Sequence, residues 1–565
     1  MRIRALVIAA ALLAGSAATV SAAPSATRPT AQPRTAARTA LGLHADDFRT
    51  AATLPAARMR VLAEHRKAAP SAGLTASTQQ PIWGYGNGES GLPDVDGDGV
   101  GDVLSSRLYA RKPALKVLSG RTGRTLWSVP SPTDTLAAVY IPAPGGKSVM
   151  LVLTETVTGQ ETPVGGGEVD AFTVKAVSPK TGASVWSTTI TGLIEDDPSG
   201  LLAAGLGEFD GALMRKNTTP YLLLDRFTLH FDGLTFTTSV APLVIDATTG
   251  STVDPGAPEG GDEFTFATPV GDLNGDGIDD YLICAGGDVP STAARSGATG
   301  QPLWTTNGTA YAFLVSLVPS PDLTGDHKAD LLLGWYDGGE EPVVHAINGA
   351  TGADVWTASG DFGLPIGDID HDGRSDTRVY VGGLRLTFSA IGGTGKRLWS
   401  RDVLSPSGTH GWAWDAGDMD GDHYADAYVE FVPGKDNSAA KAAATVSGRN
   451  GKSHTIPDLG IPLRVSLRGG APSFVRGVAG KKGYTLTAYD GRSHRAFWRT
   501  MVKSADVQRI SMLDVVDLGH GRTGLLALLT GRFDNTVVLF DGRHGNRLWT
   551  SVYETPGEDD GISFE

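Results

Sequence analysis

The chain has one cysteine in 565 residues, Cys284, so no disulfide can form within it. The surrounding run at 281–285 reads Tyr-Leu-Ile-Cys-Ala, which predicts a buried, unreactive thiol. No apolar run after residue 22 reaches the roughly 20 residues that span a bilayer, so we expect no membrane span. The folded state must therefore be held by packing and, as argued below, by bound metal.

Positive charge is also scarce over most of the chain. Residues 1–80 carry ten Lys and Arg against three Asp and Glu, so residues 81–565 carry a net charge of −21 where the whole chain carries −14. A protein that binds nucleic acid through its backbone phosphates needs a basic surface. The acidic composition therefore argues against nucleic acid as a partner.

The first 80 residues differ in composition from the rest. Residues 1–22 are typical of a secretory signal peptide, with Arg2 and Arg4 before an apolar run at 5–14 and the small residues Val-Ser-Ala at 20–22. No cysteine follows that run, which argues against a lipid anchor. Residues 23–80 are rich in Ala, Pro and Thr and predict a linker or pro-region. We expect a secreted, extracellular, monomeric protein whose folded part spans residues 81–565.

An acidic loop of nine residues recurs five times in that part. Oxygen-bearing side chains at positions 1, 3, 5 and 9, with the backbone carbonyl of position 7, suit calcium, which takes six to eight oxygen ligands. The predicted ligands are Asp94, Asp96, Asp98, Val100 and Asp102 in loop one; Asp272, Asn274, Asp276, Ile278 and Asp280 in loop two; Asp322, Thr324, Asp326, Lys328 and Asp330 in loop three; Asp368, Asp370, Asp372, Arg374 and Asp376 in loop four; and Asp418, Asp420, Asp422, Tyr424 and Asp426 in loop five. The sequence thus predicts up to five calcium sites and a fold that chelation destabilises.

The five loops are not equivalent. None is an EF-hand, because position 12 holds a strand residue instead of the bidentate Glu that an EF-hand requires. Position 6, where a sharp turn favours Gly, holds His327 in loop three and His423 in loop five. Histidine tolerates positive φ better than most residues. Because Thr324 also removes a carboxylate, we rank loops one, four and five as the most acidic sites, loop two next and loop three last.

A second signature alternates with the acidic loop. It reads as a hairpin, such as LSGRTGRTLW at 118–127, in which a Thr-Gly or Asn-Gly pair supplies the positive φ of a tight turn. Seven of the eleven tryptophans end this signature: Trp127, Trp186, Trp304, Trp356, Trp399, Trp498 and Trp549. A large aromatic residue at one fixed place in every unit predicts packing between neighbouring units.

The spacing of these signatures predicts the fold. Loops two to five begin at residues 272, 322, 368 and 418, and eroded copies near 145, 209, 468 and 517 continue the count to nine units. About 50 residues per unit fit four short antiparallel strands. We interpret each loop as the start of a unit. An all-β repeat of this kind closes best as a β-propeller, because a ring leaves few strand edges open; we expect seven to nine blades.

Both signatures resemble known propeller repeats. The hairpin Gly-x-Thr-Gly-x-x-Leu-Trp resembles the pyrroloquinoline-quinone-type (PQQ-like) repeat. The loop Asp-x-Asp-Gly-Asp-Gly-x-x-Asp resembles the FG-GAP (VCBS-type) repeat of integrin α propellers and of secreted bacterial proteins. Together they cover about residues 90–550, and the resemblance implies a propeller with calcium in its loops. These repeats occur in proteins of many functions, so they indicate architecture and not activity.

Catalytic signals are weak. No His-Glu-x-x-His motif occurs, and quinone-dependent dehydrogenases, as the resemblance implies, use a Cys pair that this chain lacks. His410, Trp412 and Trp414 form the densest irregular cluster, although the repeat register favours blade packing for Trp412. We therefore expect a binding or adhesion scaffold for a glycan or extracellular protein ligand.

The alternative is a carbohydrate-active enzyme, namely a calcium-dependent polysaccharide lyase. Enzymes of that type handle uronates with Lys, Arg or His, for which Lys435, Arg464 and His410 are available.

Overall fold

The computed structural model describes twenty segments: residues 82–85, 87–107, 114–130, 135–142, 148–161, 167–191, 201–206, 212–216, 219–231, 236–253, 259–261, 265–285, 291–307, 313–336, 342–381, 386–403, 411–431, 442–503, 507–531 and 534–554. The predicted signal peptide and linker, and the eroded loops near 145 and 209, lie outside these residues. So do His410 and Lys435.

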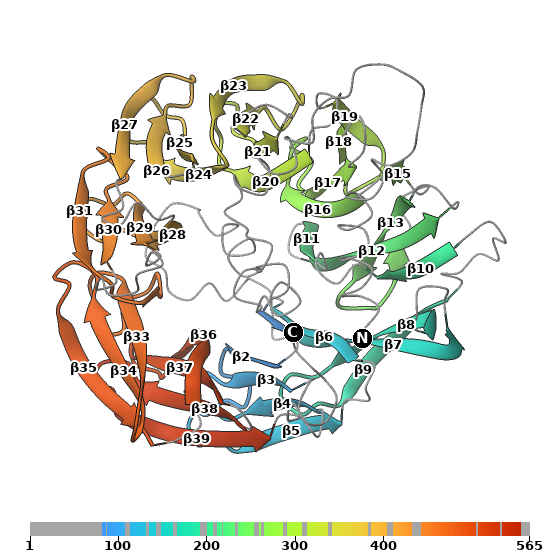
Figure 1. Cartoon of the computed structure of the whole chain (residues 1–565). Helices are drawn as coiled ribbons and strands as arrows, with labels where there is room; N and C mark the ends of the chain where they lie inside the picture. Colours follow the sequence, from blue (N-terminus) through green and yellow to red (C-terminus); the bar gives the residue numbers. More distant parts are fainter. Residues whose placement is uncertain are drawn as a thin grey trace, which may run out of the picture. The chain divides into compact units, whose positions relative to one another are not determined.

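Every described element is a β-strand, and no described helix could cross a membrane. The strands form nine antiparallel sheets, seven of which have four strands that follow one another along the chain. These sheets are the blades of a β-propeller (Figure 1), which confirms the predicted fold class and the four-stranded unit.

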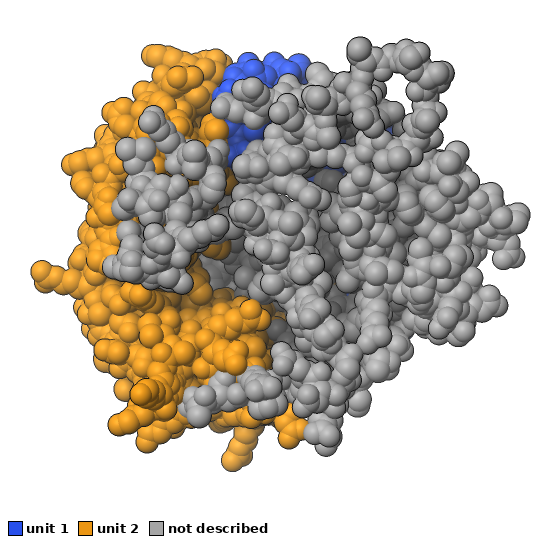
Figure 2. Space-filling model, viewed as in Figure 1, with its two compact units in different colours: residues 1–45, 142–176, 184–363 blue, residues 46–141, 177–183, 364–565 orange. Residues whose placement is uncertain are grey.

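Two compact units divide the described chain (Figure 2). Unit 1 contains residues 1–45, 142–176 and 184–363. Unit 2 contains residues 46–141, 177–183 and 364–565. Each unit is described separately below.

Unit 1 holds two four-stranded blades and the strands of two larger sheets. The blades are β16 (Thr265–Gly271), β17 (Asp280–Ala285), β18 (Ser291–Arg295) and β19 (Pro302–Asn307), and β20 (Phe313–Ser320), β21 (Asp330–Tyr336), β22 (Val343–Ile347) and β23 (Asp354–Ser359). The six-stranded sheet contains β10 (Leu201–Leu206), β11 (Ala212–Lys216), β12 (Thr219–Phe231), β13 (Phe236–Asp246), β14 (Thr252–Val253) and β15 (Glu259–Gly261). β7 (Val149–Glu161), β8 (Gly167–Val177) and β9 (Ser184–Thr191) follow one another in a further sheet, whereas β1 (Ile82–Tyr85) and β6 (Thr135–Ile141), which pair with each other, fall in unit 2.

Unit 2 holds five four-stranded blades. They are β2 (Asn87–Gly91), β3 (Val103–Arg107), β4 (Ala114–Leu118) and β5 (Thr125–Pro130); β24 (Phe362–Gly367), β25 (Asp376–Val381), β26 (Leu386–Ile391) and β27 (Arg397–Val403); β28 (Gly411–Gly417), β29 (Asp426–Phe431), β30 (Ala442–Val446) and β31 (Ser453–Pro457); β32 (Ile461–Pro462), β33 (Ser473–Gly480), β34 (Gly483–Asp490) and β35 (Ala496–Val502); and β36 (Val507–Asp517), β37 (Thr523–Gly531), β38 (Asp534–Asp541) and β39 (Arg547–Glu554).

The acidic loops connect the first strand of a blade to the second. Loop one joins β2 to β3, and loop five joins β28 to β29. The prediction that each loop begins a unit was therefore wrong by one strand. The strand before loop one reads NGESG, and so short a Gly-rich segment carries no strand pattern. The Trp-ending hairpins connect the third strand to the fourth, so in an antiparallel blade loop and hairpin lie at the same end.

The tryptophans pack between neighbouring blades, as predicted. In unit 2 the indole N–H of Trp399 donates to the carbonyl of Gly448 at 3.2 Å, and that of Trp498 donates to Gly542 at 2.7 Å. In unit 1 the indole N–H of Trp304 donates to Gly349 at 2.6 Å. These three rings thus fill the space beside the hairpin of the next blade and satisfy their own N–H donors there.

The hairpin glycine beside each ring has two constraints. Gly182 has φ 68°, and a Cβ there would lie 2.9 Å from the ring of Trp127. Only glycine adopts this conformation freely and leaves room for the indole face.

The last blade of unit 2 packs against the first. The indole N–H of Trp549 in β39 donates to the carbonyl of Gly120 at 2.8 Å, and the backbone N–H of Gly91 in β2 donates to the Asp514 carboxylate at 3.0 Å. One buried apolar cluster contains residues of both blades, including Val103 of the first and Leu526 and Leu539 of the last. Residues more than 400 positions apart thus share one core.

Cys284 is buried in β17, as its apolar surroundings predict. The hydroxyl of Thr292 lies 4.0 Å from its sulfur.

Candidate metal centre

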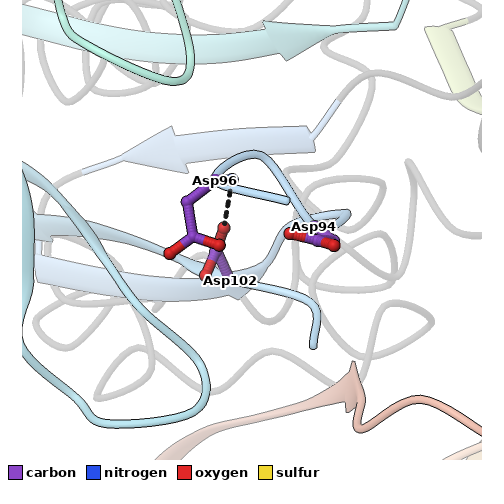
Figure 3. Close-up of side chains that lie close together, drawn as sticks. All are labelled: Asp94, Asp96 and Asp102. Carbon is purple, nitrogen blue, oxygen red and sulfur yellow. Dashed lines mark hydrogen bonds between the residues drawn. The ribbon is translucent and has the colours of Figure 1, made fainter. Parts of the chain in front are cut away.

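Three of the five acidic loops bring carboxylates together. In loops one, four and five, one carboxylate oxygen from each of positions 1, 3 and 9 lies within 4.8 Å of the other two. Figure 3 shows this arrangement in loop one for Asp94, Asp96 and Asp102. The corresponding groups are Asp368, Asp370 and Asp376 in loop four, and Asp418, Asp420 and Asp426 in loop five. These are the loops that the sequence ranks as most acidic.

The carboxylate at position 9 is buried and bonded in the same way in every loop. One oxygen of Asp102 accepts the backbone N–H of Gly120 in the hairpin at 3.0 Å, and the other accepts those of Val95 and Asp96 at 2.9 and 3.3 Å. The hairpin bond recurs at 3.0, 2.9, 3.2 and 2.9 Å for Asp280, Asp330, Asp376 and Asp426, with Gly297, Gly349, Gly393 and Gly448 as donors. Position 9 therefore joins the acidic loop to the hairpin, a role that the sequence alone did not reveal.

These buried carboxylates lack sufficient compensating charge. Burial raises the pKa of Asp102, Asp280 and Asp376 to about 6 and that of Asp426 to about 7, against the opposing effect of the backbone N–H donors. The pKa of Asp330 is also raised, again mainly by burial. A carboxylate that accepts several backbone N–H bonds ordinarily has a lowered pKa, so at position 9 the effect of burial outweighs that of the N–H donors.

Positions 1, 3 and 5 shape the loop backbone. The Asp94 carboxylate accepts the N–H groups of Gly97 and Gly99 at 2.6 and 2.7 Å, and the Asp98 carboxylate accepts that of Val100, position 7, at 2.9 Å. The same contact at 2.9–3.0 Å ties position 5 to Ile278, Lys328, Arg374 and Tyr424.

Position 5 stands outside the three carboxylate groups. In loop one the guanidinium of Arg121 donates to Asp98 at 3.0 Å, and in loop three the amide of Asn348 donates to Asp326 at 3.2 Å. The structure therefore brings positions 1, 3 and 9 together in loops one, four and five, and it bonds position 5 to a hairpin residue in loops one and three.

Loops two and three have weaker donor sets at position 3. The side-chain amide of Asn274 donates to Asp276 and Asp280 at 3.1 and 3.4 Å, so it lies among the carboxylates. Thr324 offers only a hydroxyl, which accepts a bond from the Asn348 amide at 3.3 Å. The ammonium of Lys328 donates to the backbone carbonyl of Asn274 at 3.1 Å, which adds a positive charge beside loop two.

The histidines in the loops occupy the positive-φ positions that the sequence indicated. His327 and His423 at position 6 have φ 64° and 74°, and His371 at position 4 has φ 63°. Six non-glycine residues in the described segments have positive φ, and five are histidines. The Nδ1 atoms of His327 and His423 lie 3.6 and 3.9 Å from the position 1 carboxylates Asp322 and Asp418. These histidines replace glycine in the turn and, when protonated, compete with a cation.

Of the residues expected for a lyase, Arg464 alone lies in the described part of the chain. Arg464 pairs with Asp415 at 3.3 Å, while His410 and Lys435 lie outside the described residues. Trp414 is half-buried against a cluster that includes Met419, Tyr428 and Phe474, as blade packing predicts.

A polar cluster that the sequence did not indicate lies between the first and last blades of unit 2. Glu89 in β2 is 1% exposed, and one of its oxygens accepts the Ser105 hydroxyl at 2.9 Å and lies 3.9 Å from Arg107. Arg107 lies 4.3 Å from the ring centroid of Tyr553 and donates to Ser551 at 3.1 Å. Burial raises the pKa of Glu89 to about 8, although Arg107 opposes the shift. The other oxygen of Glu89 has no hydrogen-bond partner.

The comparisons with known proteins give fold relatives alone. No family model matches the sequence, and no curated protein matches it. Among solved structures, the Bacillus licheniformis rhamnogalacturonan lyase PL11 aligns with 12% identity, covering 80% of this chain and 88% of that one, with a TM-score of 0.37. A europium-containing methanol dehydrogenase aligns with 12% identity over 66% and 84%, with a TM-score of 0.29.

The quinohemoprotein alcohol dehydrogenase of Comamonas testosteroni aligns with 12% identity, covering 92% of this chain and 77% of that one, with a TM-score of 0.25. At such identities and TM-scores, the activities of these proteins carry no argument for this chain.

Proposed function

We propose that this protein is a secreted, calcium-binding β-propeller of the FG-GAP (VCBS) type that serves as a scaffold for binding a glycan or an extracellular protein. The observation that carries the metal proposal is the buried carboxylate at position 9. Backbone N–H groups donate to this carboxylate in all five loops, yet burial raises its pKa in every one of them.

Two other blades of unit 2 support the proposal that this carboxylate has a cation as its partner. In the blades with eroded loops, the hairpin N–H groups of Gly491 and Gly542 donate to the carbonyls of Pro472 and Thr523 at 2.9 and 3.0 Å. A neutral carbonyl thus fills the structural role. A buried carboxylate adds a charge that must be neutralised, and the all-oxygen donor set suits a hard cation such as Ca²⁺.

Calcium in these loops would stabilise the fold. It would neutralise positions 1, 3 and 9 and hold the loop to the hairpin of its own blade. Five ions would lower the charge of residues 81–565 from −21 to −11. A chain without disulfides would thereby gain stability outside the cell, where modules of this kind bind calcium at about 10⁻⁴–10⁻³ M.

Calorimetric titration and thermal melting of the full chain test the metal. We expect calcium to bind with a stoichiometry of three or more and chelation by EDTA to lower Tm by about 5 °C or more, because ligand binding stabilises the folded state by mass action. Magnesium at the same concentration is the control and should restore little. An unchanged Tm after chelation would contradict a structural role for calcium.

The scaffold role needs a separate test. A glycan array and a screen of extracellular proteins, each with calcium and with EDTA, should give binding that is lost on chelation. Turnover of acidic polysaccharides, followed by absorbance of the unsaturated product, would instead identify a lyase and overturn the scaffold proposal.

A further inference from the structure

Loops four and five of unit 2 contact each other in both directions. The hydroxyl of Tyr424, position 7 of loop five, donates to the backbone carbonyl of Asp368, position 1 of loop four, at 3.2 Å. The guanidinium of Arg378, two residues after Asp376 of loop four, donates to the carbonyl of Ala425, position 8 of loop five, at 2.9 Å. Each loop therefore fixes the backbone of the other next to a predicted ligand.

Both contacts are made inside the protein. Arg378 is 3% exposed. Burial lowers the pKa of its guanidinium, and the nearby carboxylates of Asp415 and Asp426 oppose that shift. The Tyr424 ring is half-buried, and a Cβ on Gly367, the residue before Asp368, would lie 3.7 Å from it. Both groups are therefore confined by packing.

The other loops lack this arrangement. In unit 1, position 7 of loop three also reaches the preceding loop, but the group that arrives beside Asn274 is the Lys328 ammonium. A positive charge there opposes a cation in loop two, whereas the Tyr424 hydroxyl is neutral. In unit 2, loop one lies beside the eroded loop at 517–523, where the N–H of Gly101 donates to the Asp517 carbonyl at 2.6 Å. Loop one thus has no complete loop as a neighbour there.

We propose that loops four and five bind calcium as a coupled pair, in which the hydroxyl of Tyr424 makes occupancy of one loop favour occupancy of the other. The inference rests on the proposed calcium function. A cation in loop five would be held in part by the Tyr424 carbonyl, and ordering Tyr424 would also order the hydroxyl that donates to the Asp368 carbonyl. The second ion then binds a backbone that is already ordered, which is positive cooperativity through a reduced ordering cost.

Calorimetric calcium titration of full-length variants tests the pair. Asp370→Asn removes a carboxylate from loop four and Asp420→Asn does the same in loop five. Under the proposal, each variant loses one ion and also weakens one remaining site about fivefold, the low end of typical coupling. Asp96→Asn, in the unpaired loop one, is the matched control and should lose one ion and leave the others unchanged.

Tyr424→Phe identifies the residue responsible. It keeps the backbone carbonyl ligand and removes the hydroxyl, so Asp370→Asn in this background should no longer weaken the loop five site. Tyr221→Phe, a hydroxyl removed from β12 in unit 1, should leave the fivefold effect intact. If the fivefold effect survives Tyr424→Phe, the assignment to Tyr424 is overturned. Far-ultraviolet circular dichroism checks folding, and the reciprocal Asp420→Asn series substitutes for a loop four variant that does not fold.

The two proposals fail in different ways. If the wild-type protein binds no calcium, the proposed function fails. If it binds calcium but Asp370→Asn and Asp420→Asn each remove one ion without weakening another, the calcium function stands and the coupling is refuted.

Discussion

Unit 2 contains two kinds of blade that share one architecture. Three blades carry complete acidic loops, and two carry the eroded loops at 463–473 and 517–523, yet all five have four strands, with a hairpin between the third and the fourth. In the complete loops the hairpin glycine donates to a buried carboxylate, as Gly120 does to Asp102. In the eroded loops it donates to a backbone carbonyl, and Ser473 accepts the loop N–H of Leu467 at 3.0 Å.

The comparison of complete and eroded loops separates what the blade needs to fold from what the carboxylates add. In the eroded loop at 463–473 a hydroxyl and a carbonyl take the place of the position 9 carboxylate, so that blade does not require an aspartate there. Each of the three complete loops places one buried carboxylate close to two others that are exposed or half-buried, and carboxylates so close together repel one another.

A substitution at position 9 should show the largest contrast. Asp426→Ala leaves the buried N–H groups of Gly448 and Met419 without an acceptor and should lower the free energy of unfolding by about 3 kcal/mol. Ser473→Ala, the equivalent change in an eroded loop, should lower it by about 1 kcal/mol. Urea denaturation in saturating calcium measures both, and equal losses would contradict the distinction.

The hairpins of unit 2 offer a second contrast, because one of its blades lacks the tryptophan. Gly182 faces the Trp127 ring, whereas the equivalent residue in the β34–β35 hairpin is His494 with φ 57°. The blade before it has Thr455 where the others have tryptophan, so there is no indole for a side chain to meet. Gly182→Ala should destabilise by about 2 kcal/mol and His494→Ala by less than about 1 kcal/mol. Thermal melting compares the two.

Buried carboxylates differ in the number of hydrogen-bond donors around them, and this difference should affect how the stability of the fold depends on pH. Glu89 accepts one hydroxyl where Asp102 accepts three N–H groups, and its pKa rises from 4.5 to about 8 on folding. The folded state then holds a proton that the unfolded state releases, so Glu89 reduces stability progressively as pH rises from about 4.5 to 8.

Glu89→Gln should therefore gain stability relative to the wild type by about 1 kcal/mol or more between pH 5 and pH 8. Urea denaturation at each pH measures the difference, and Asp402→Asn, an exposed carboxylate of unit 2, is the control. A constant difference across this range would show that Glu89 stays ionised.

The smallest effect should come from position 6 of the acidic loops. His423 holds φ 74° where Gly99 holds 86° in loop one. His423→Gly relieves an unfavourable conformation and removes a competing imidazole near Asp418, and it should tighten calcium binding at loop five by about threefold. Gly99→His should weaken loop one by a similar factor. Calorimetric titration measures both, and no change in either would assign the histidines another role.

The sequence by itself determined the repeating elements, because their signals are local. A Gly at positive φ, a Trp four residues later and an aspartate every second position specify a hairpin and a loop without reference to the rest of the chain. The all-β class, the four-stranded unit, the buried Cys284 and the positive φ at His327 and His423 all followed from such signals.

The tertiary structure decided what those elements touch. The strand before loop one, β2, carries no strand pattern in its sequence and becomes a strand by pairing with β3. The bond from Gly120 to Asp102, the contacts of Tyr424 and Arg378 between loops, and the burial of Glu89 against the last blade join residues 18 to several hundred positions apart. Such contacts depend on how blades stack, which local propensity does not encode, and they determine which carboxylates lose their water and need a cation.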